Sequence, residues 1–342
     1  MKIRAQSKTP GVRVVAIGGG TGLSTLLRGL KHYVARRRQQ GTERQPIGDL
    51  AAIVTVTDDG GSSGRLRREY QTLPPGDIRN CMVALSQDEA LLARLFQYRF
   101  REGRGLRGHS FGNLFLTALS RVTGDFAEAV RVSSRVLAIR GRIFPTTIEN
   151  VSLEAVMTDG KVVSGETSIT NSDKKIRRLR LRPRHVHPLP EVLDAIAEAD
   201  LILVGPGSLY TSILPNLLVS GVAEAIEISH ATTIYIANLM TQPGETNGYT
   251  LTDHLRAIRQ HTRRQLFDWV VASNQPLSIE VARRYKARGA EAVSVSTAEV
   301  ERMGVHCVLD NLLEEHGVVR HDSARLSRLL IREFITRQAP RM

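Results

Sequence analysis

The sequence predicts an α/β fold: a three-layer, mostly parallel sheet with helices on both faces and a small antiparallel β insert. Short β-branched apolar segments alternate with segments of helical periodicity over the first 150 residues and again after residue 190. Two short strand-like segments flank Asp159 and Gly160, a pair typical of a two-residue hairpin turn. No linker rich in Pro, Gly or Ser divides the chain. We therefore expect residues 1–342 to form one α/β domain with the insert at about 150–185.

The first predicted strand-to-helix transition is the most informative segment of the chain. Residues 12–17 form an apolar run typical of a buried strand, and leucines at helical spacing begin at Leu23. The residues between them are Gly18, Gly19, Gly20, Thr21 and Gly22. Glycines allow a ligand to approach the backbone, and the N–H groups at a helix N-terminus favour anions. We predict a Rossmann-like phosphate- or nucleotide-binding turn, although Leu23 replaces the third glycine of the dinucleotide pattern. A turn with no ligand is the alternative.

The second predicted strand, residues 51–57, ends in another glycine-rich turn. The polar side chains of this turn are Asp58, Asp59, Ser62, Ser63 and Arg65. The two acids can accept hydrogen bonds from a ribose or a base, or hold Mg²⁺. The hydroxyls can donate to a ligand, and the arginine suits a phosphate. The alternative is a turn capped by an aspartate.

Two predicted helix starts carry further polar residues. Asp77 follows a Pro-Pro-Gly turn and is placed to cap a helix, and Asn80 would face whatever lies at that helix start. Capping alone accounts for Asp77, so a structural role stays open. Ser110 is predicted to cap another helix, whose start is bracketed by His109 and Asn113. We expect His109 and Asn113 to bind an anion, with acid–base catalysis by His109 or a structural role as alternatives.

From residue 151 onward the pattern first changes and then returns to strand–helix alternation. The insert strands are predicted at 152–158, 161–167 and 176–182. Helices are predicted from Pro190 and from about Ser323, the latter capped by Asp322 or Ser323. The remaining strands are predicted at 201–204, 233–237, 269–272, 292–295 and 306–309. The polar turns after the strands at 201–204 and 233–237 place further candidate ligand-binding residues beside the first turn: Gly205, Gly207, Ser208 and Asn238.

Composition limits the classes of function. The net charge is +13, yet the basic residues are dispersed and aromatic content is only 5%. We therefore expect no nucleic-acid partner and assign the charge to attraction of phosphorylated metabolites. No apolar run reaches the roughly 18–20 residues of a membrane span, and residues 1–10 lack the apolar core of a signal peptide. With only two cysteines, these features predict a cytoplasmic protein without membrane insertion.

No catalytic residue and no metal site is assigned from the residues themselves. The chain lacks a G-x-S-x-G motif, and no His or Cys residues have zinc-ligand spacing.

Taken in order, the polar segments resemble the YvcK/CofD-like family over nearly the whole chain. The segments that carry the resemblance are 18–23, 58–67, 74–80, 108–113, 205–218 and 241–246. The last two segments resemble the gluconeogenesis-factor branch of the family rather than its transferase branch.

That resemblance implies a protein that binds uridine-diphosphate sugars such as UDP-N-acetylglucosamine. It also implies a requirement for normal cell shape, or morphogenesis, during growth on gluconeogenic carbon sources. By resemblance Tyr285 would stack on uracil and Arg320 would bind the diphosphate next to the glycine turn. The branch can carry a phosphorylatable residue at the position of Ser323, which is otherwise a simple helix cap.

The resemblance further implies proteins of cell-wall synthesis or a Ser/Thr kinase as partners, and it leaves a homo-oligomer open. No cofactor is expected beyond the UDP-sugar, with Mg²⁺ left open. The alternative function is that of the other branch: a Mg²⁺-dependent enzyme similar to 2-phospho-L-lactate transferase, acting on a nucleotide-activated substrate.

Overall fold

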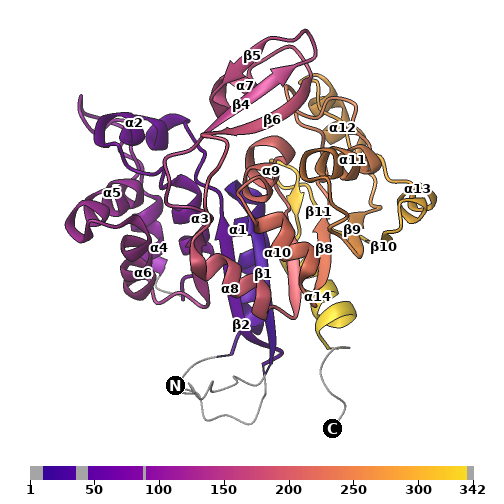
Figure 1. Ribbon diagram of the computed structural model, residues 1–342, viewed down its shortest axis with the longest axis horizontal. Helices are drawn as coiled ribbons and strands as arrows, with labels where there is room; N and C mark the ends of the chain where they lie inside the picture. Colours follow the sequence, from indigo (N-terminus) through magenta and orange to yellow (C-terminus); the bar gives the residue numbers. More distant parts are fainter. Residues whose placement is uncertain (1–10, 36–44, 88–89, 337–342) are drawn as a thin grey trace.

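The computed structural model describes residues 11–35, 45–87 and 90–336 and contains a seven-stranded parallel sheet with two smaller antiparallel sheets (Figure 1). Residues 1–10 and most of the predicted loop at 35–46 lie outside the described residues. The order of the large sheet is β10-β9-β8-β7-β1-β2-β3. The chain therefore runs outward from β1 to β3 and later returns to the other side of β1. The predicted fold class is confirmed.

The central strands of the large sheet are buried on both faces, as parallel strands between helices are, whereas the edge strand β10 is partly exposed. The strands of the large sheet are β1 (Val12–Gly18), β2 (Ile47–Val54), β3 (Arg142–Pro145), β7 (Leu201–Val204), β8 (Thr232–Ile236), β9 (Trp269–Ser273) and β10 (His306–Asp310). The insert consists of β4 (Ser152–Met157), β5 (Val162–Ser164) and β6 (Ile176–Arg182), all antiparallel. The short strands β11 (Leu313–Glu314) and β12 (Arg320–His321) pair with each other.

Helices cover both faces of the large sheet. In the first half the helices are α1 (Gly20–Leu30), α2 (Gly61–Tyr70), α3 (Gly76–Leu85), α4 (Ala90–Gln97), α5 (Phe111–Thr123) and α6 (Phe126–Val136). Helix α7 (Glu166–Thr170) belongs to the insert and packs against β4 and β5. In the second half they are α8 (Pro190–Glu198), α9 (Leu214–Leu217), α10 (Val222–Ile228), α11 (Leu251–Thr262), α12 (Ile279–Lys286), α13 (Thr297–Arg302) and α14 (Ser323–Leu330). Helix α1 packs against α3 and α14, whereas α8 and α10 pack together over the sheet (Figure 1).

Strand β1 marks the point where the order of the sheet reverses. Val14 pairs in parallel with Leu50 of β2 on one side and with Leu201 of β7 on the other. The loops that leave β1 and β7 diverge there, which opens a space beyond the carboxyl ends of the strands. The sheet topology therefore places the glycine-rich turns after β1 and β7 next to each other.

Two expected strands differ in the structure. Residues 292–295 form no strand and keep a single bridge between Ala292 and Met240. The reason is that Val293 N–H donates to the Leu239 carbonyl, while the Ser294 carbonyl accepts from Leu251 N–H at the start of α11. The insert strand predicted at 161–167 ends at Ser164. A φ of +91° at Gly165 turns the chain into α7 instead.

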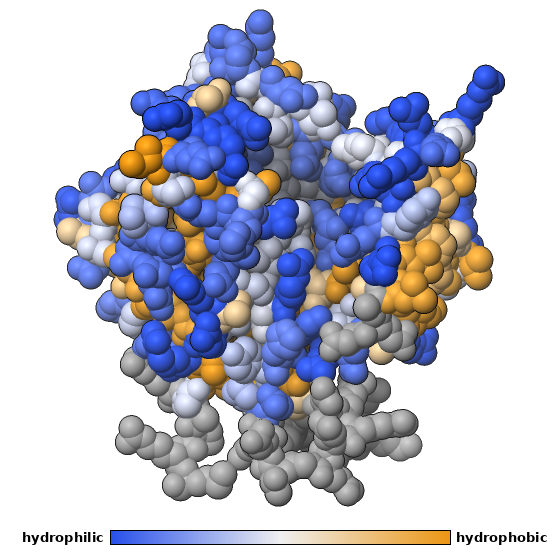
Figure 2. Space-filling view, turned by 180° about the vertical axis from the view of Figure 1, so that it is seen from behind, coloured by the Kyte–Doolittle hydropathy of each residue, from blue (hydrophilic) through white to orange (hydrophobic). Residues whose placement is uncertain are grey.

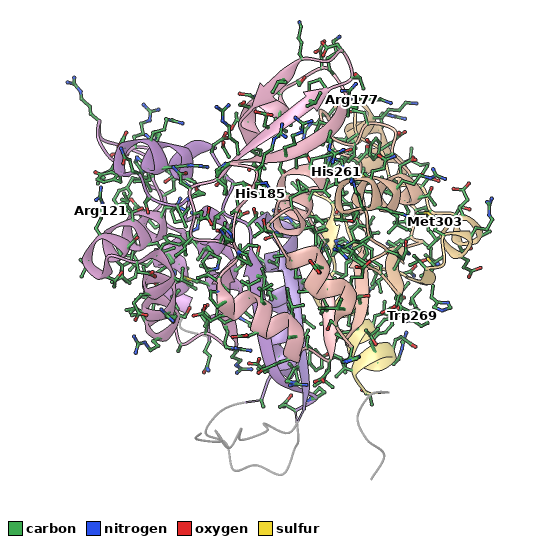
Figure 3. All side chains as sticks on the ribbon, viewed as in Figure 1. Arg121, Arg177, His185, His261, Trp269 and Met303 are labelled. Atoms are coloured by element: carbon green, nitrogen blue, oxygen red, sulfur yellow. The ribbon has the colours of Figure 1, made fainter. Side chains whose placement is uncertain are left out.

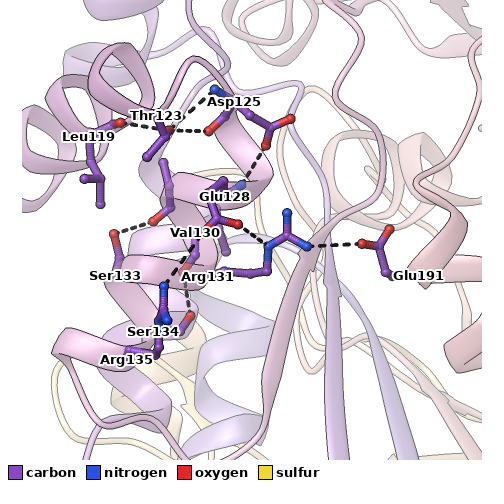
Figure 4. A network of polar contacts seen from close by, with 11 residues as sticks. Leu119, Thr123, Asp125, Glu128, Val130, Arg131, Ser133, Ser134, Arg135 and Glu191 are labelled. Atoms are coloured by element: carbon purple, nitrogen blue, oxygen red, sulfur yellow. Dashed lines mark hydrogen bonds and ion pairs between the residues drawn. The ribbon is translucent and has the colours of Figure 1, made fainter.

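The flank made by α4, α5 and α6 differs from the rest of the surface. Exposed apolar side chains such as Leu91 and Val122 lie there, and Figure 2 shows apolar residues gathered on that side of the molecule. Arg131 of α6 joins this flank to α8, because its guanidinium contacts Glu128 at 2.7 Å and Glu191 at 3.4 Å (Figure 4).

Among the described residues, no single helix has the length and apolar composition needed to cross a membrane. The helical segments Leu209–Leu217 and Val222–Ile228 meet these criteria only when they are counted together, and the pair is bent by 73°.

Candidate functional site

A cavity of about 310 Å³ opens at the carboxyl ends of β1 and β7, and we call it the crevice. Its walls come from the turns after β1, β7 and β8, the start of α3, the insert and β12. The predicted site residues that line it are Gly19, Gly20, Thr21, Gly22, Asp77, Gly207, Ser208, Asn238 and Arg320. The structure thus brings together residues that are up to 300 positions apart in the sequence.

The glycines after β1 are required by the close approach of two loops. A Cβ at Gly22 would lie 2.3 Å from the Pro206 carbonyl oxygen in the turn after β7. A Cβ at Gly19 would lie 2.6 Å from Thr55 Cγ2 and 2.7 Å from Asp77 Oδ2. Gly19 is the N-cap residue of α1 and offers no capping side chain. Gly20 N–H donates to the Asp77 carboxyl group, so an anion in the crevice would have to bind the N–H groups of Thr21 and Gly22 in the first turn of α1.

The turn after β7 is held by amide side chains. Gly207 N–H donates to Asn238 Oδ1 at 3.2 Å, and Gln242 Nε2 donates to Ser208 Oγ at 2.7 Å. Asn216 Nδ2 donates to the Gly18 carbonyl at 3.0 Å. This bond joins the segment after β7, which begins at Gly205, to Gly18 at the end of β1. Sequence reasoning missed Asn216 and Gln242, although both lie in segments that carried the family resemblance.

Two carboxyl groups form what we call the acidic wall of the crevice, Asp77 and Glu166. Asp77 does not cap α3, contrary to expectation: Pro75 is the N-cap residue, and the carboxyl group lies in the first turn facing α1. Burial and the neighbouring Asp58 raise the pKa of Asp77 to about 7, against the hydrogen bond from Gly20 N–H. Burial and the carboxylates of Asp58 and Asp77 raise the pKa of Glu166 to about 9. Nothing in the sequence pattern singled out Glu166, because residues 161–167 were expected to be a strand.

The insert is fastened over the acidic wall at three points. Thr167 donates to Asp59 Oδ1 from its N–H at 2.9 Å and from its hydroxyl at 2.7 Å. Gly244 approaches α7 so closely that a Cβ there would lie 2.0 Å from the Thr170 carbonyl oxygen. Leu179 N–H donates to Nε2 of His261 on α11 at 2.9 Å, below the insert (Figure 3). Asp59 is therefore engaged by the insert, while Asp58 Oδ1 accepts from Gly60 N–H.

The other predicted polar residues make a separate group that does not line the crevice. We call it the closed polar cluster: Ser62, Ser63, Arg79, His109, Ser110 and Asn113. Asn113 Nδ2 donates to the hydroxyls of Ser62 and Ser63 at 3.2 and 3.4 Å. Ser62 Oγ also bonds His109 Nδ1 at 3.0 Å.

Arg79, expected with Asn80 to face whatever lies at the start of its helix, completes the closed polar cluster. Its guanidinium donates to Ser110 Oγ at 2.6 Å, Asn113 Oδ1 at 3.0 Å and Asn80 Oδ1 at 2.7 Å. Ser110 caps α5 as expected, accepting from Asn113 N–H. Burial, with Arg65 nearby, lowers the pKa of His109, so its ring is neutral at pH 7. The Arg65 side chain itself donates to the Arg107 carbonyl at 2.8 Å.

The residues expected to bind the nucleotide lie at the β8 and β12 side of the crevice. Arg320 is exposed and lines the cavity. Tyr285 does not line it: its hydroxyl accepts from Val319 N–H at 2.8 Å, and its ring packs in a cluster with Leu239, Met240 and Val319. Those three apolar residues do line the crevice.

Asp322 caps the N-terminus of α14. Its carboxylate accepts from the N–H groups of Ala324 and Arg325 at 3.0 Å. Ser323 is thus the first residue of α14 rather than its cap, and it lies against Gly29 of α1. Among the described residues, no group of three or more His, Cys, Asp or Glu side chains has the geometry to hold a metal ion.

A parallel sheet that reverses at β1, with a glycine-lined crevice at the reversal, defines a Rossmann-like α/β protein. The chain belongs to the CofD family: the family model described as 2-phospho-L-lactate transferase CofD matches residues 14–313. The resemblance stated from the sequence is confirmed.

Relatives in this family cover almost the whole chain. The gluconeogenesis factor of Bacillus subtilis is 46% identical over 320 residues, 93% of this chain and 97% of the relative. The gluconeogenesis factor of Halalkalibacterium halodurans is 47% identical over 319 residues, 93% of this chain and 95% of the relative. The crystal structure of a UPF0052 family protein from Bacillus halodurans has a TM-score of 0.88 at 46% identity, covering 94% of this chain and 99% of that one.

Proposed function

We propose that this protein is a cytoplasmic UDP-sugar-binding regulator that supports normal cell shape during growth on gluconeogenic carbon sources. The observation that carries the proposal is the crevice at the reversal of the sheet, where the N-terminus of α1, whose N-cap residue Gly19 has no capping side chain, faces the turn after β7. The crevice volume of about 310 Å³ suits a small-molecule ligand. The names of the relatives, gluconeogenesis factors, support the link to growth on gluconeogenic carbon sources.

The chemistry of the crevice fits the parts of a nucleotide sugar. Glycine N–H groups and Arg320 supply positive potential for a diphosphate. The carboxamide side chains of Asn238 and Gln242 can pair with the imide edge of uracil. Among the described residues, no side chain that lines the crevice is arranged as a nucleophile beside a base. This favours ligand binding over catalytic turnover.

Calorimetric titration with UDP-N-acetylglucosamine tests the binding. We expect saturable one-site binding by the wild-type protein and at least tenfold weaker binding by Arg320→Ala. Gly105→Ala is the matched control, since a Cβ at Gly105 meets nothing within 4 Å. Absence of binding by the wild-type protein would refute the proposal.

An enzyme of the transferase type is the second candidate, favoured by the description of the family model and by the carboxyl groups beside the glycine turn. Asp58 and Asp77 are the residues that would hold a Mg²⁺ ion for such a reaction. Incubation with the nucleotide sugar and Mg²⁺ separates the two functions: release of UMP or UDP supports the enzyme, and recovery of intact ligand supports the regulator.

A further inference from the structure

The crevice has two chemically different ends, and the strand order sets them apart. Along the carboxyl edge of the sheet the order is β2-β1-β7-β8. Asp58 follows β2, whereas Asn238, Leu239 and Met240 follow β8. Neighbouring strands are about 4.8 Å apart, so the two ends are separated by about 14 Å, with the glycine turns after β1 and β7 between them. That separation matches an extended ligand whose anionic centre lies over the glycine turns.

The end beside β2 is acidic. Asp77 and Glu166 line the crevice there, and α7 is fastened above them through Asp59. The carboxyl groups near enough to act on Glu166 are Asp58, Asp77, Glu245 and Asp59. The cations on this side do not line the crevice: Arg79 is bonded within the closed polar cluster, although it lies near enough to lower the pKa of Asp77, and Arg67 donates to Asn150 Oδ1 at 2.7 Å.

The end beside β8 is apolar and carries amides. Leu239, Met240 and Val319 line it, backed by the Tyr285 ring. Gln242 donates to Ser208, and its Oε1 atom is buried without a hydrogen-bond partner among the described residues. A flat base with one imide N–H and two carbonyl groups suits these surfaces, because its faces are apolar and its edge pairs with amides.

We propose that the crevice holds a nucleotide sugar with the sugar ring beneath α7, against Asp77 and Glu166, and with the uracil at the Leu239 end, and that it therefore selects neutral sugars over uronic-acid sugars. This inference rests on the proposed function and adds the orientation and the sugar class. Sugar hydroxyls can donate to the Asp77 carboxylate and accept from the protonated Glu166 carboxyl group. Uracil carbonyl groups can only accept, so they give the Asp77 carboxylate no donor, which disfavours the opposite orientation.

A carboxylate on the sugar meets unfavourable surroundings at the acidic end. The pKa of Glu166 is raised because its surroundings disfavour a negative charge on its carboxyl group. A uronate brought next to it experiences the same carboxylates and the same removal from water. No described cation on that wall is placed to compensate the charge.

The test compares UDP-glucose with UDP-glucuronate, which differ only in a hydroxymethyl or carboxylate group at C6. Calorimetry on the wild-type protein at pH 7.5 is expected to give at least tenfold weaker binding of UDP-glucuronate. Equal affinity for the two ligands overturns the inference and leaves the proposed function standing. Failure of both to bind overturns the proposed function itself.

Two variants locate the discrimination. Glu166→Lys is expected to reduce the ratio of the two affinities to less than threefold or to invert it. Ser168→Lys adds the same charge to the exposed side of α7 and is expected to keep the wild-type ratio. A similar change of the ratio in both variants contradicts a local role of the acidic wall. The wild-type comparison decides the inference even where a variant does not fold.

Discussion

The crevice and the closed polar cluster look alike in the sequence but differ in how their polar atoms are used. Both contain Ser and Asn residues in glycine-containing segments, and both follow predicted turns. In the crevice, the N-cap residue of α1, Gly19, has no capping side chain, and the first turn of α1 lines a cavity. In the cluster, each side chain is hydrogen-bonded to another, as His109 is to Ser62 and Asn113 is to Arg79, although Arg79 Nε is buried without a partner among the described residues. The polar groups of the crevice line a space that a ligand can enter, whereas most of those in the cluster are paired with one another.

That difference separates two roles that residue types alone do not distinguish. A buried polar group must find a partner, and the partner is either a neighbouring side chain or a ligand. The cluster joins α2, α3 and α5, so we expect its contribution to be to stability. The crevice is expected to contribute to binding. Mutations in the two regions should therefore change different measured quantities.

The largest effect is expected from Gly22→Ala. The new methyl group would overlap the Pro206 carbonyl oxygen, which is backbone and cannot rotate away. The turns after β1 and β7 must then separate, at a cost of about 3 kcal/mol in the free energy of unfolding. We expect loss of detectable UDP-sugar binding by calorimetry together with this loss of stability in urea.

A milder variant keeps the prediction testable if Gly22→Ala does not fold. A Cβ at Gly207 would lie 3.3 Å from Ser212 Cβ, so Gly207→Ala requires only a small shift of the same turn. It should weaken binding with a loss of stability below about 1 kcal/mol. Unchanged affinity in Gly207→Ala would contradict the assignment of this turn to ligand binding.

Asn113→Ala tests the other side of the comparison. Asn113 is 2% exposed, and its removal takes one hydrogen bond each from Ser62, Ser63 and Arg79 inside the cluster, although Ser62 keeps its bond to His109 and Arg79 keeps its bond to Ser110. We expect a loss of about 2 kcal/mol in the free energy of unfolding, measured in urea, and less than a threefold change in ligand affinity. A large loss of affinity with unchanged stability would instead show that Asn113 contacts the ligand, as the sequence first suggested.

Arg320→Ala should show the opposite pattern. Arg320 is exposed, and no hydrogen bond of its side chain is found among the described residues, so its removal should leave the melting temperature within about 2 °C of wild type. The affinity for a UDP-sugar should fall about tenfold, or about 1.4 kcal/mol, because one cation near the diphosphate is lost. An Arg320→Lys variant that restores part of the affinity would assign the effect to charge.

The two regions should also respond to pH in opposite directions. The pKa of Glu166, about 9, lies above its ordinary value of 4.5, so the folded protein binds this proton more tightly than the unfolded chain. The free energy of unfolding therefore falls as pH rises between about 4.5 and 9, by at most about 1.4 kcal/mol per pH unit for this group. The pKa of His109 lies below 6.5, so its contribution is lost as pH falls below 6.5.

Urea unfolding between pH 5 and pH 9 checks both signs. Glu166→Gln should flatten the decline above pH 7, and His109→Gln should flatten the decline below pH 6.5. If Glu166→Gln leaves the profile unchanged, the acidic wall does not hold a proton in the folded protein.

The sequence predicts the sheet and the glycine turn well because both depend on local patterns. The apolar strands and the helical spacing after Gly22 need no distant contact to be recognised, and β1, α1 and β7 are close to their expected positions. The prediction of a strand at 292–295 was wrong because the backbone N–H and carbonyl groups of this segment bond to the loop after β8 and to the start of α11. Propensity over four residues cannot report such distant partners.

The side chains of the crevice were only partly predictable, for the same physical reason. Residues placed by a strand end, such as Gly207 and Asn238, follow from topology. Glu166 does not, because the insert positions it through contacts with Asp59 and the loop at Gly244 that join different parts of the chain. The distinction between crevice and cluster likewise depends on which hydroxyl meets which amide.

The smallest effect is expected at the surface network of Figure 4, which lies in neither region. Arg131 contacts Glu128 and Glu191 with all three side chains well exposed to water. Solvent screening leaves such pairs little net value, so Arg131→Gln should change the free energy of unfolding by less than about 1 kcal/mol and should leave ligand affinity unchanged. Compared with Asn113→Ala, the Arg131→Gln variant shows how much free energy of unfolding is lost when the substituted side chain is exposed rather than buried. A tenfold loss of affinity in Arg131→Gln would mean that distant changes reach the crevice, and affinity could then no longer separate the two regions.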